Sequence, residues 1–167
     1  MNLRGIDTLI LDVDGVLTPG DVTFADQGSR VMSFNIHDGL AIKRWQRAGH
    51  RVAILSGRVS PVVDRRAAEL GIARVLQSVS DKDRAYVELL REFETMPDAV
   101  CCMGDDHPDI PVLRNCGFAV VVANAAPAVK RWADYVTRRP GGQGAVAEAI
   151  ELVLRKQRRW QPATGND

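Results

Sequence analysis

Short apolar runs recur along the chain, each followed by polar or glycine-containing sequence. Five of them are rich in valine, isoleucine and leucine: Thr8–Leu11, Val52–Leu55, Arg74–Leu76, Val100–Met103 and Phe118–Val122. Apolar runs of this length without alternating polar positions are typical of strands that are buried on both faces. They predict the strands of a parallel sheet.

Segments with helical periodicity separate these runs. The predicted helices are Leu40–Ala48, Pro61–Leu70, Ala85–Phe93 and Gln143–Gln157. The first two are followed by glycines that favour helix ends. Strands that alternate with helices of this length predict βαβ units. We therefore expect an α/β fold, a Rossmann-like three-layer sandwich with a mostly parallel sheet.

The stretch between Leu17 and Asp38 interrupts this alternation. Val22 and Phe24 alternate with polar residues, the segment Val31–Phe34 is typical of a return strand, and an Asp-Gln-Gly sequence between them favours a turn. We predict a β-hairpin over about residues 18–35 that projects from the end of the first strand.

Length and composition narrow the class of protein. A chain of 167 residues suits one domain, which we place at residues 1–160 with a mobile tail at 161–167. Its 46% apolar and 26% charged residues exclude a disordered chain, and a net charge of +1 gives no field toward nucleic acid or membrane. Three cysteines form no disulfide framework, and neither a signal peptide nor a membrane span is apparent. We expect a cytoplasmic protein.

Two carboxylates follow the first predicted strand directly, in the sequence Leu11-Asp12-Val13-Asp14-Gly15. In an open parallel sheet, ligands bind beyond the carboxyl ends of the strands. A catalytic or metal-binding role for Asp12 and Asp14 is therefore one interpretation. For this motif alone, turn-forming or capping aspartates are the alternative.

A second acidic cluster, Gly104-Asp105-Asp106-His107-Pro108-Asp109, follows another predicted strand. Two acidic strand ends brought together repel each other unless a cation lies between them. Hard oxygen ligands that are open to solvent suit Mg²⁺ better than Zn²⁺. The alternative is an aspartate-rich helix start, in which Asp109 is favourable near the helix N-terminus. We assign no role to His107.

Two further positions complete the candidate chemistry. Ser56 and Gly57 follow a third strand and could offer hydroxyl and backbone N–H donors to an anion, although a helix N-cap is the favoured explanation for Ser56 taken alone. Lys82 opens a helix, where a cation opposes the helix dipole. Such a local conflict is expected at functional positions.

Taken in order, these four motifs resemble those of the haloacid dehalogenase superfamily. Within it the chain resembles the 3-deoxy-D-manno-octulosonate 8-phosphate phosphatases, a family without a large cap domain. The resemblance runs from about Ile6 to Gln157. The sequence departs from the family pattern at His107-Pro108 and at Leu40-Ala41. These departures bear on the identity of the substrate rather than on phosphatase activity. It is carried by residues 12–18, 37–43, 56–58, 81–82, 104–112 and 135–146.

The resemblance implies a Mg²⁺-dependent phosphomonoester hydrolase that acts through an aspartyl-phosphate. Asp12 would be the nucleophile, Asp14 the acid and then the base, and Lys82 the partner of both nucleophile and phosphate. Mg²⁺ would be held by Asp12, the backbone carbonyl of Asp14 and Asp105. Phosphate and substrate would be bound by Gly15, Ser56, Gly57 and Arg58, with support from Asp106 and Asp109.

The resemblance also implies a substrate, a partner and a pathway. Arg58 suits a sugar carboxylate and favours 3-deoxy-D-manno-octulosonate 8-phosphate, although a solvated surface arginine is the alternative. A nine-carbon sugar-acid phosphate, another small phosphomonoester and a non-catalytic regulatory subunit also stay open. We expect a homotetramer formed through the hairpin, with a place in lipopolysaccharide biosynthesis.

Two segments near the C-terminus have less specific explanations. The loop of Arg139, Gly141, Gly142 and Gly144 is either a substrate contact or a flexible turn. The basic residues of 155–159 end a helix, where cations suit the dipole, and do not indicate nucleic-acid binding.

Overall fold

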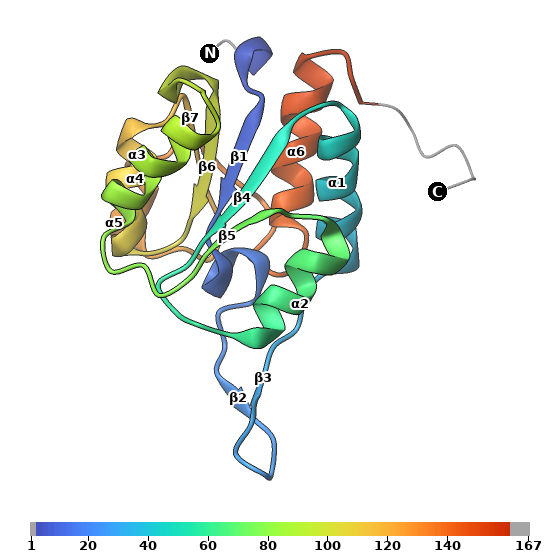
Figure 1. Ribbon diagram of the computed structural model, residues 1–167, viewed down its shortest axis with the longest axis vertical. Helices are drawn as coiled ribbons and strands as arrows, with labels where there is room; N and C mark the ends of the chain where they lie inside the picture. The colour runs from blue at the N-terminus through green and yellow to red at the C-terminus, as the bar shows by residue number, and fades with distance from the viewer. Residues whose placement is uncertain (1–2, 161–167) are drawn as a thin grey trace, which may run out of the picture.

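The computed structural model describes residues 3–160 and contains one six-stranded sheet (Figure 1). The strand order is β5-β4-β1-β6-β7-β8, and every neighbouring pair is parallel. The strands are β1 (Thr8–Leu11), β4 (Arg51–Leu55), β5 (Arg74–Leu76), β6 (Val100–Gly104), β7 (Phe118–Val121) and β8 (Tyr135–Val136).

Helices cover both faces of this sheet. One face carries α1 (Ile36–Arg47), α2 (Pro61–Leu70) and α6 (Ala145–Lys156) (Figure 1). The other carries α3 (Lys82–Glu92), α4 (Ile110–Asn115) and α5 (Pro127–Lys130). Short 3₁₀ turns lie at Leu3–Gly5, Pro97–Ala99 and His107–Asp109. The predicted three-layer α/β sandwich is confirmed.

The core explains why the central strands are continuous apolar runs. All residues of β1, β6 and β7 are buried, since helices pack on both sides of them. Trp45 of α1 and Phe118 of β7 are among the largest fully buried side chains. Burial of one such aromatic side chain contributes on the order of 1.5–3 kcal/mol.

The sequence predicted the bounds of β1, β5 and α2 as the structure has them. Helix α1, however, begins at Ile36 rather than at Leu40. The reason is its cap, because the Asn35 side chain accepts hydrogen bonds from the backbone N–H groups of His37 and Asp38. Helix α3 begins at Lys82, which was predicted to open a helix, ahead of the periodic segment Ala85–Phe93, and Asp81 caps it.

Helix α4 was predicted only as the alternative of an aspartate-rich helix start, and α5 and β8 were not predicted. They have six, four and two residues, which is shorter than the window in which periodicity can be recognised. Strand β8 is recognisable only through its pairing with β7 at the edge of the sheet.

The predicted hairpin is present and projects from the edge of the sheet at which the strands end (Figure 1). It consists of β2 (Thr23–Phe24) and β3 (Arg30–Val31), which pair in antiparallel fashion. The return strand is shorter than the predicted segment Val31–Phe34. The predicted mobile tail at 161–167 lies outside the described residues. Among the helices of residues 3–160, none is long and apolar enough to cross a membrane.

Candidate active site

The carboxyl ends of three adjacent strands bring the predicted site residues together. Asp12 follows β1, Ser56 follows β4 and Asp105 follows β6, and β1 lies between the other two strands. These ends surround an open cavity of about 260 Å³. The cavity is lined by Asp12, Asp14, Gly20, Ser56, Gly57, Arg58, Lys82, Asp105, Asp106, Pro108 and Asp109.

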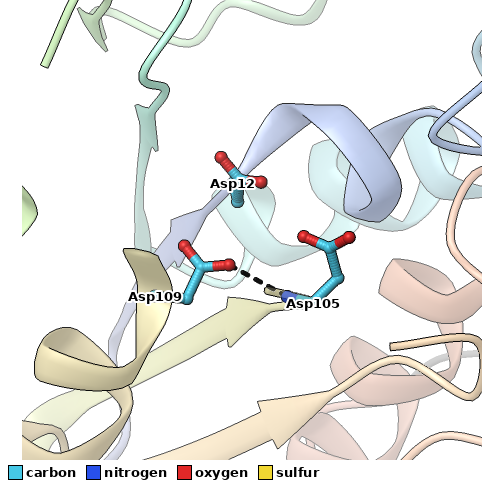
Figure 2. Close-up of side chains that lie close together, drawn as sticks. All are labelled: Asp12, Asp105 and Asp109. Atoms are coloured by element: carbon cyan, nitrogen blue, oxygen red, sulfur yellow. Dashed lines mark hydrogen bonds between the residues drawn. The ribbon is translucent and has the colours of Figure 1, made fainter. Parts of the chain in front are cut away.

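Three carboxylates form the acidic centre of this cavity. Asp12, Asp105 and Asp109 each offer an oxygen atom, and these oxygens all lie within 4.8 Å of one another (Figure 2). Burial and the charge of Asp109 raise the pKa of Asp12 to about 6. Burial and the charges of Asp12 and Asp109 raise the pKa of Asp105 to about 7. Asp12 and Asp105 therefore resist simultaneous ionisation.

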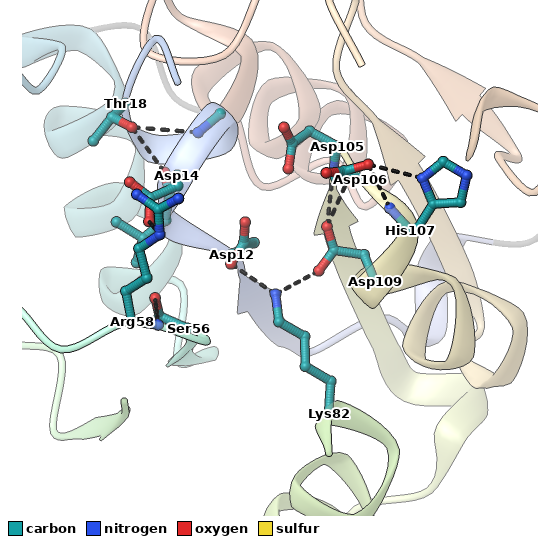
Figure 3. Close-up of polar contacts among 12 residues, drawn as sticks. Asp12, Asp14, Thr18, Ser56, Arg58, Lys82, Asp105, Asp106, His107 and Asp109 are labelled. Carbon is teal, nitrogen blue, oxygen red and sulfur yellow. Dashed lines mark hydrogen bonds and ion pairs between the residues drawn. The ribbon is translucent and has the colours of Figure 1, made fainter. Parts of the chain in front are cut away.

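Lys82 lies between two of these carboxylates. Its Nζ donates to Asp12 Oδ1 at 2.8 Å and to Asp109 Oδ1 at 2.6 Å (Figure 3). Burial alone would lower the pKa of Lys82, but the charges of Asp12 and Asp109 outweigh it and raise that pKa. The positive charge of Lys82, which the α3 dipole disfavours at the start of the helix, is thus stabilised by two carboxylates.

Asp109 combines the two roles that the sequence left open. Its Oδ1 binds Lys82, while its Oδ2 accepts from the backbone N–H groups of Asp105 at 2.9 Å and Asp106 at 3.2 Å. The residue therefore caps the 3₁₀ turn and also belongs to the site. Asp106, in contrast, is exposed, and its carboxylate contacts the backbone N–H and ring of His107.

Asp14 reaches the cavity by a route that the sequence did not predict. If the strand continued through Asp14, the two-residue spacing would place Asp12 and Asp14 on one face of it. In fact β1 ends at Leu11, and residues Val13–Leu17 form a single wide turn of π-helical type, which we call the site turn. Gly15 has a φ of +88° within it, a conformation that favours glycine.

The site turn is closed by Thr18. The Thr18 hydroxyl donates to Val13 O at 3.2 Å and accepts from Gly15 N–H at 3.3 Å. Asp105 packs against the same glycine, because a Cβ at Gly15 would lie 2.1 Å from Asp105 Oδ2. Gly15, predicted as a phosphate contact, thus shapes the space in which Asp105 lies.

The Asp14 carboxylate lies between two arginines. Arg30 Nη2 of the hairpin donates to Asp14 Oδ1 at 2.7 Å, and Arg58 Nε lies 3.8 Å from Asp14 Oδ2. Sequence reasoning missed Arg30, because nothing in a two-residue strand indicates where its side chain points. Arg58 is well exposed at the cavity mouth, with 59% of its side chain accessible.

Ser56 lies at the wall of the cavity and not at a helix start. It is buried, and its hydroxyl accepts from the backbone N–H of Arg58 at 3.3 Å (Figure 3). The N-cap of α2 is Ser60. The favoured explanation of Ser56 as an N-cap is therefore wrong, and the residue faces the site together with Gly57.

The glycine-rich loop before α6 packs against the site turn. Gly142 N–H donates to Val16 O at 2.9 Å, and a Cβ at Gly141 would lie 1.6 Å from Gly15 O. Asp38, another residue that sequence reasoning gave no role, is buried and accepts from the N–H groups of Gly144 at 3.2 Å and Ala147 at 2.8 Å. The loop is thus fixed at both ends and supports the site turn.

The acidic centre fits a Mg²⁺ ion. All its donors are hard carboxylate oxygens, which Mg²⁺ prefers, and the raised pKa values of Asp12 and Asp105 reflect a burial and repulsion that a cation would offset. Both oxygens of Asp109 already hold hydrogen bonds. Asp12 and Asp105 are therefore the two side chains best able to bind the ion.

Comparison with known proteins agrees with this chemistry. Residues 67–150 match a model of haloacid dehalogenase-like hydrolases. The chain is 41% identical over 160 residues to 3-deoxy-D-manno-octulosonate 8-phosphate phosphatase of Yersinia pestis, an alignment that covers 96% of this chain and 86% of the relative. It is also 41% identical over 162 residues to that enzyme of Escherichia coli K12, with 97% and 86% covered.

Solved structures of similar proteins have the same fold. The crystal structure of the Yersinia pestis phosphatase matches with a TM-score of 0.94 and 40% identity, covering 98% of this chain and 89% of that one. The phosphatase of Moraxella catarrhalis, solved with magnesium, phosphate and KDO, matches at 0.91 and 36%, covering 94% and 90%. A cobalt-bound phosphatase of Haemophilus influenzae matches at 0.90 and 37%, covering 94% and 92%.

Proposed function

The chain belongs to the haloacid dehalogenase-like hydrolases, and within them to the 3-deoxy-D-manno-octulosonate 8-phosphate phosphatases, and on this premise we propose that it hydrolyses that sugar-acid phosphate to the free sugar acid and phosphate. One observation carries the proposal: Asp12, Asp105 and Lys82 come from three separate parts of the chain and meet in one cavity. The relatives supply the identity of the sugar acid.

In the first half of the reaction Asp12 is the nucleophile. Lys82 binds its Oδ1, which leaves Oδ2 free to form a bond to phosphorus. The bond between phosphorus and the sugar oxygen breaks, and Asp14 gives its proton to that oxygen. The free sugar acid leaves, and phosphate stays bound to Asp12 as an acyl phosphate.

In the second half, water replaces Asp12 at phosphorus. Asp14, now ionised, takes a proton from the attacking water. The bond between phosphorus and the Asp12 oxygen breaks, phosphate leaves, and Asp14 is again protonated. Asp14 is suited to both steps because it lines the same cavity as Asp12 and is the less buried of the two.

Mg²⁺ would be held by the side chains of Asp12 and Asp105 and the backbone carbonyl of Asp14, where it would neutralise phosphate charge and orient the phosphoryl group. Asp109 positions Lys82 from behind. Asp106 lies at the cavity mouth.

The other cavity residues suit a phosphate and a sugar acid. The Ser56 hydroxyl and the N–H of Gly57 would bind phosphate oxygens. Gly15, which is not among the residues that line the cavity, would act through the space it leaves for Asp105. The exposed guanidinium of Arg58 would meet the sugar carboxylate in a fork.

We also propose a cytoplasmic homotetramer formed through the hairpin. Val22, Phe24 and Val31 are large apolar side chains on a two-stranded ribbon, and all three are exposed. An isolated ribbon of this size has no hydrophobic core of its own, so that burial against another copy would stabilise it.

The proposed function is tested by phosphate release from a panel of sugar-acid phosphates, with Mg²⁺ and with EDTA. We expect Mg²⁺-dependent turnover with preference for the eight-carbon substrate. The Asp12→Asn variant should keep the fold, as judged by circular dichroism, and lose turnover by more than about 1000-fold. Turnover in that variant would rule out the covalent mechanism, and preference for a nine-carbon phosphate would change the substrate.

A further inference from the structure

The carboxylate of Asp14 is held from the hairpin. Arg30 Nη2 donates to Asp14 Oδ1 at 2.7 Å, and each of the two side chains is 25% exposed. Within residues 3–160, Arg30 is the sole hydrogen-bond donor to this carboxylate. The pair is partly shielded from water, so solvent screens it less than a pair at the open surface.

The backbone of Asp14 is fixed independently of this ion pair. Thr18 closes the site turn through Val13 and Gly15, and Gly142 binds the turn at Val16. What these contacts leave undetermined is the side-chain direction of Asp14. Arg30 makes the shortest contact with the side chain itself.

Arg30 and Arg58 approach Asp14 from different places. Arg58 lines the catalytic cavity, whereas Arg30 lines a separate pocket formed by residues of the hairpin segment. Arg30 therefore contacts Asp14 without lining the space that the substrate would fill. Asp14 Oδ2 faces Arg58 at 3.8 Å, which is beyond hydrogen-bond distance.

We propose that Arg30 is a positioning residue for the acid–base step: it holds Asp14 in the direction from which a proton reaches the leaving oxygen, so that the hairpin is part of the catalytic apparatus. This inference rests on the proposed function of Asp14. Without Arg30, the nearest cation to Asp14 is Arg58, and the carboxylate is expected to turn toward it and away from the leaving group.

The two steps of the reaction differ in their need for Asp14, and this difference makes the role measurable. A sugar alkoxide is a poor leaving group and needs a proton as the bond to phosphorus breaks. 4-Nitrophenolate leaves without one. Loss of Asp14 positioning therefore slows the first step for a sugar phosphate and spares it for 4-nitrophenyl phosphate.

The experiment compares Arg30→Gln, Arg30→Lys and the wild-type chain, all with Mg²⁺. Arg65→Gln, which removes an exposed arginine of α2, is the control for charge. For the sugar-acid phosphate, kcat and KM are measured. For 4-nitrophenyl phosphate, the rate of the first turnover is measured by rapid mixing, and circular dichroism checks the fold.

For Arg30→Gln we expect kcat on the sugar-acid phosphate to fall by about 10- to 100-fold, with KM changed by less than about threefold, because mispositioning removes part of a general acid's contribution. The first turnover of 4-nitrophenyl phosphate should stay within about threefold of wild type. Arg30→Lys should recover part of kcat, since an ammonium group keeps the charge but not the fork geometry.

An equal loss on both substrates would overturn the inference, because it would indicate a general structural defect. An unchanged kcat would overturn it too, and so would a rise in KM alone, which would make Arg30 a substrate contact. If the wild-type chain hydrolysed neither substrate, the proposed function would fail instead. The two failures are therefore distinguishable.

Discussion

At the residue scale, two glycines set the distances between the acidic groups. A Cβ at Gly15 would lie 2.1 Å from Asp105 Oδ2, and a Cβ at Gly104 would lie 2.5 Å from the Cβ of Asp109. Neither position tolerates a side chain without moving a carboxylate. The spacing of the acidic centre thus depends on residues that carry no functional group.

Gly15→Ala should reduce both activity and stability. The added methyl group would push Asp105 away, and an alanine at φ +88° costs about 1–2 kcal/mol in the free energy of unfolding. Urea unfolding and Mg²⁺-dependent phosphate release would measure the two effects. Gly49→Ala is a matched control, since Gly49 has a φ of +82° with no atom near the added Cβ and lies between α1 and β4, away from the site. It should lose similar stability and keep its activity, and equal activity losses would contradict the role of Gly15.

At the element scale, the sequence predicted those strands and helices whose apolar residues are buried along one continuous segment of chain. The fully buried strands β1 and β6 appear in the sequence as apolar runs. The acidic residues that follow them identified the edge of the sheet at which the site lies. The bounds of α1 depended on a cap, and β8 depended on pairing with β7. Arg30 could not be predicted, because its contact with Asp14 depends on how the hairpin folds back.

Helix α6 depends on a side chain from α1. The buried carboxylate of Asp38 accepts from two N–H groups at the start of α6, and its pKa is raised by burial. Asp38→Ala should leave both donors without this partner and lower the free energy of unfolding by about 1–3 kcal/mol in urea. Asp26→Ala, on the exposed hairpin, should change it by less than about 0.5 kcal/mol. If Asp38→Ala lowered the free energy of unfolding no more than Asp26→Ala does, water would be replacing Asp38 as the hydrogen-bond acceptor of these two N–H groups.

At the scale of the whole molecule, the acidic centre links stability to pH and Mg²⁺. In the metal-free protein the pKa of Asp105 is about 7, against a usual value of 3.8. Between these values the folded state holds a proton that the unfolded state does not. Stability without metal therefore falls as pH rises from about 4 to 7 and changes little from this group above 7.

Mg²⁺ should consequently raise the thermal midpoint more at pH 8 than at pH 5.5, because protons compete with the ion for Asp12 and Asp105 at the lower pH. Differential scanning fluorimetry with Mg²⁺ or EDTA measures this difference. Asp105→Asn is the control, in which both the Mg²⁺ shift and its pH dependence should shrink. An equal shift at both pH values would show that the ion binds elsewhere.

The hairpin should determine the assembly state. Phe24 is 65% exposed, and replacing it by serine removes the largest apolar side chain that the ribbon offers. Light scattering after gel filtration should show a tetramer for the wild-type chain and smaller species for Phe24→Ser. Ser29→Ala, a change at the hairpin turn, should keep the tetramer. A wild-type monomer would contradict the proposed assembly.

The packing of the loop before α6 against the site turn has a consequence for how the protein is made. Asp12 and Asp14 are translated before Gly142, yet the backbone N–H that supports their turn at Val16 comes from this glycine. A nascent chain that ends before this glycine carries the nucleophile without the contact that fixes its neighbour. We therefore expect the site turn to reach its final conformation only after Gly142 has left the ribosome, so that the site forms later than the synthesis of its nucleophile.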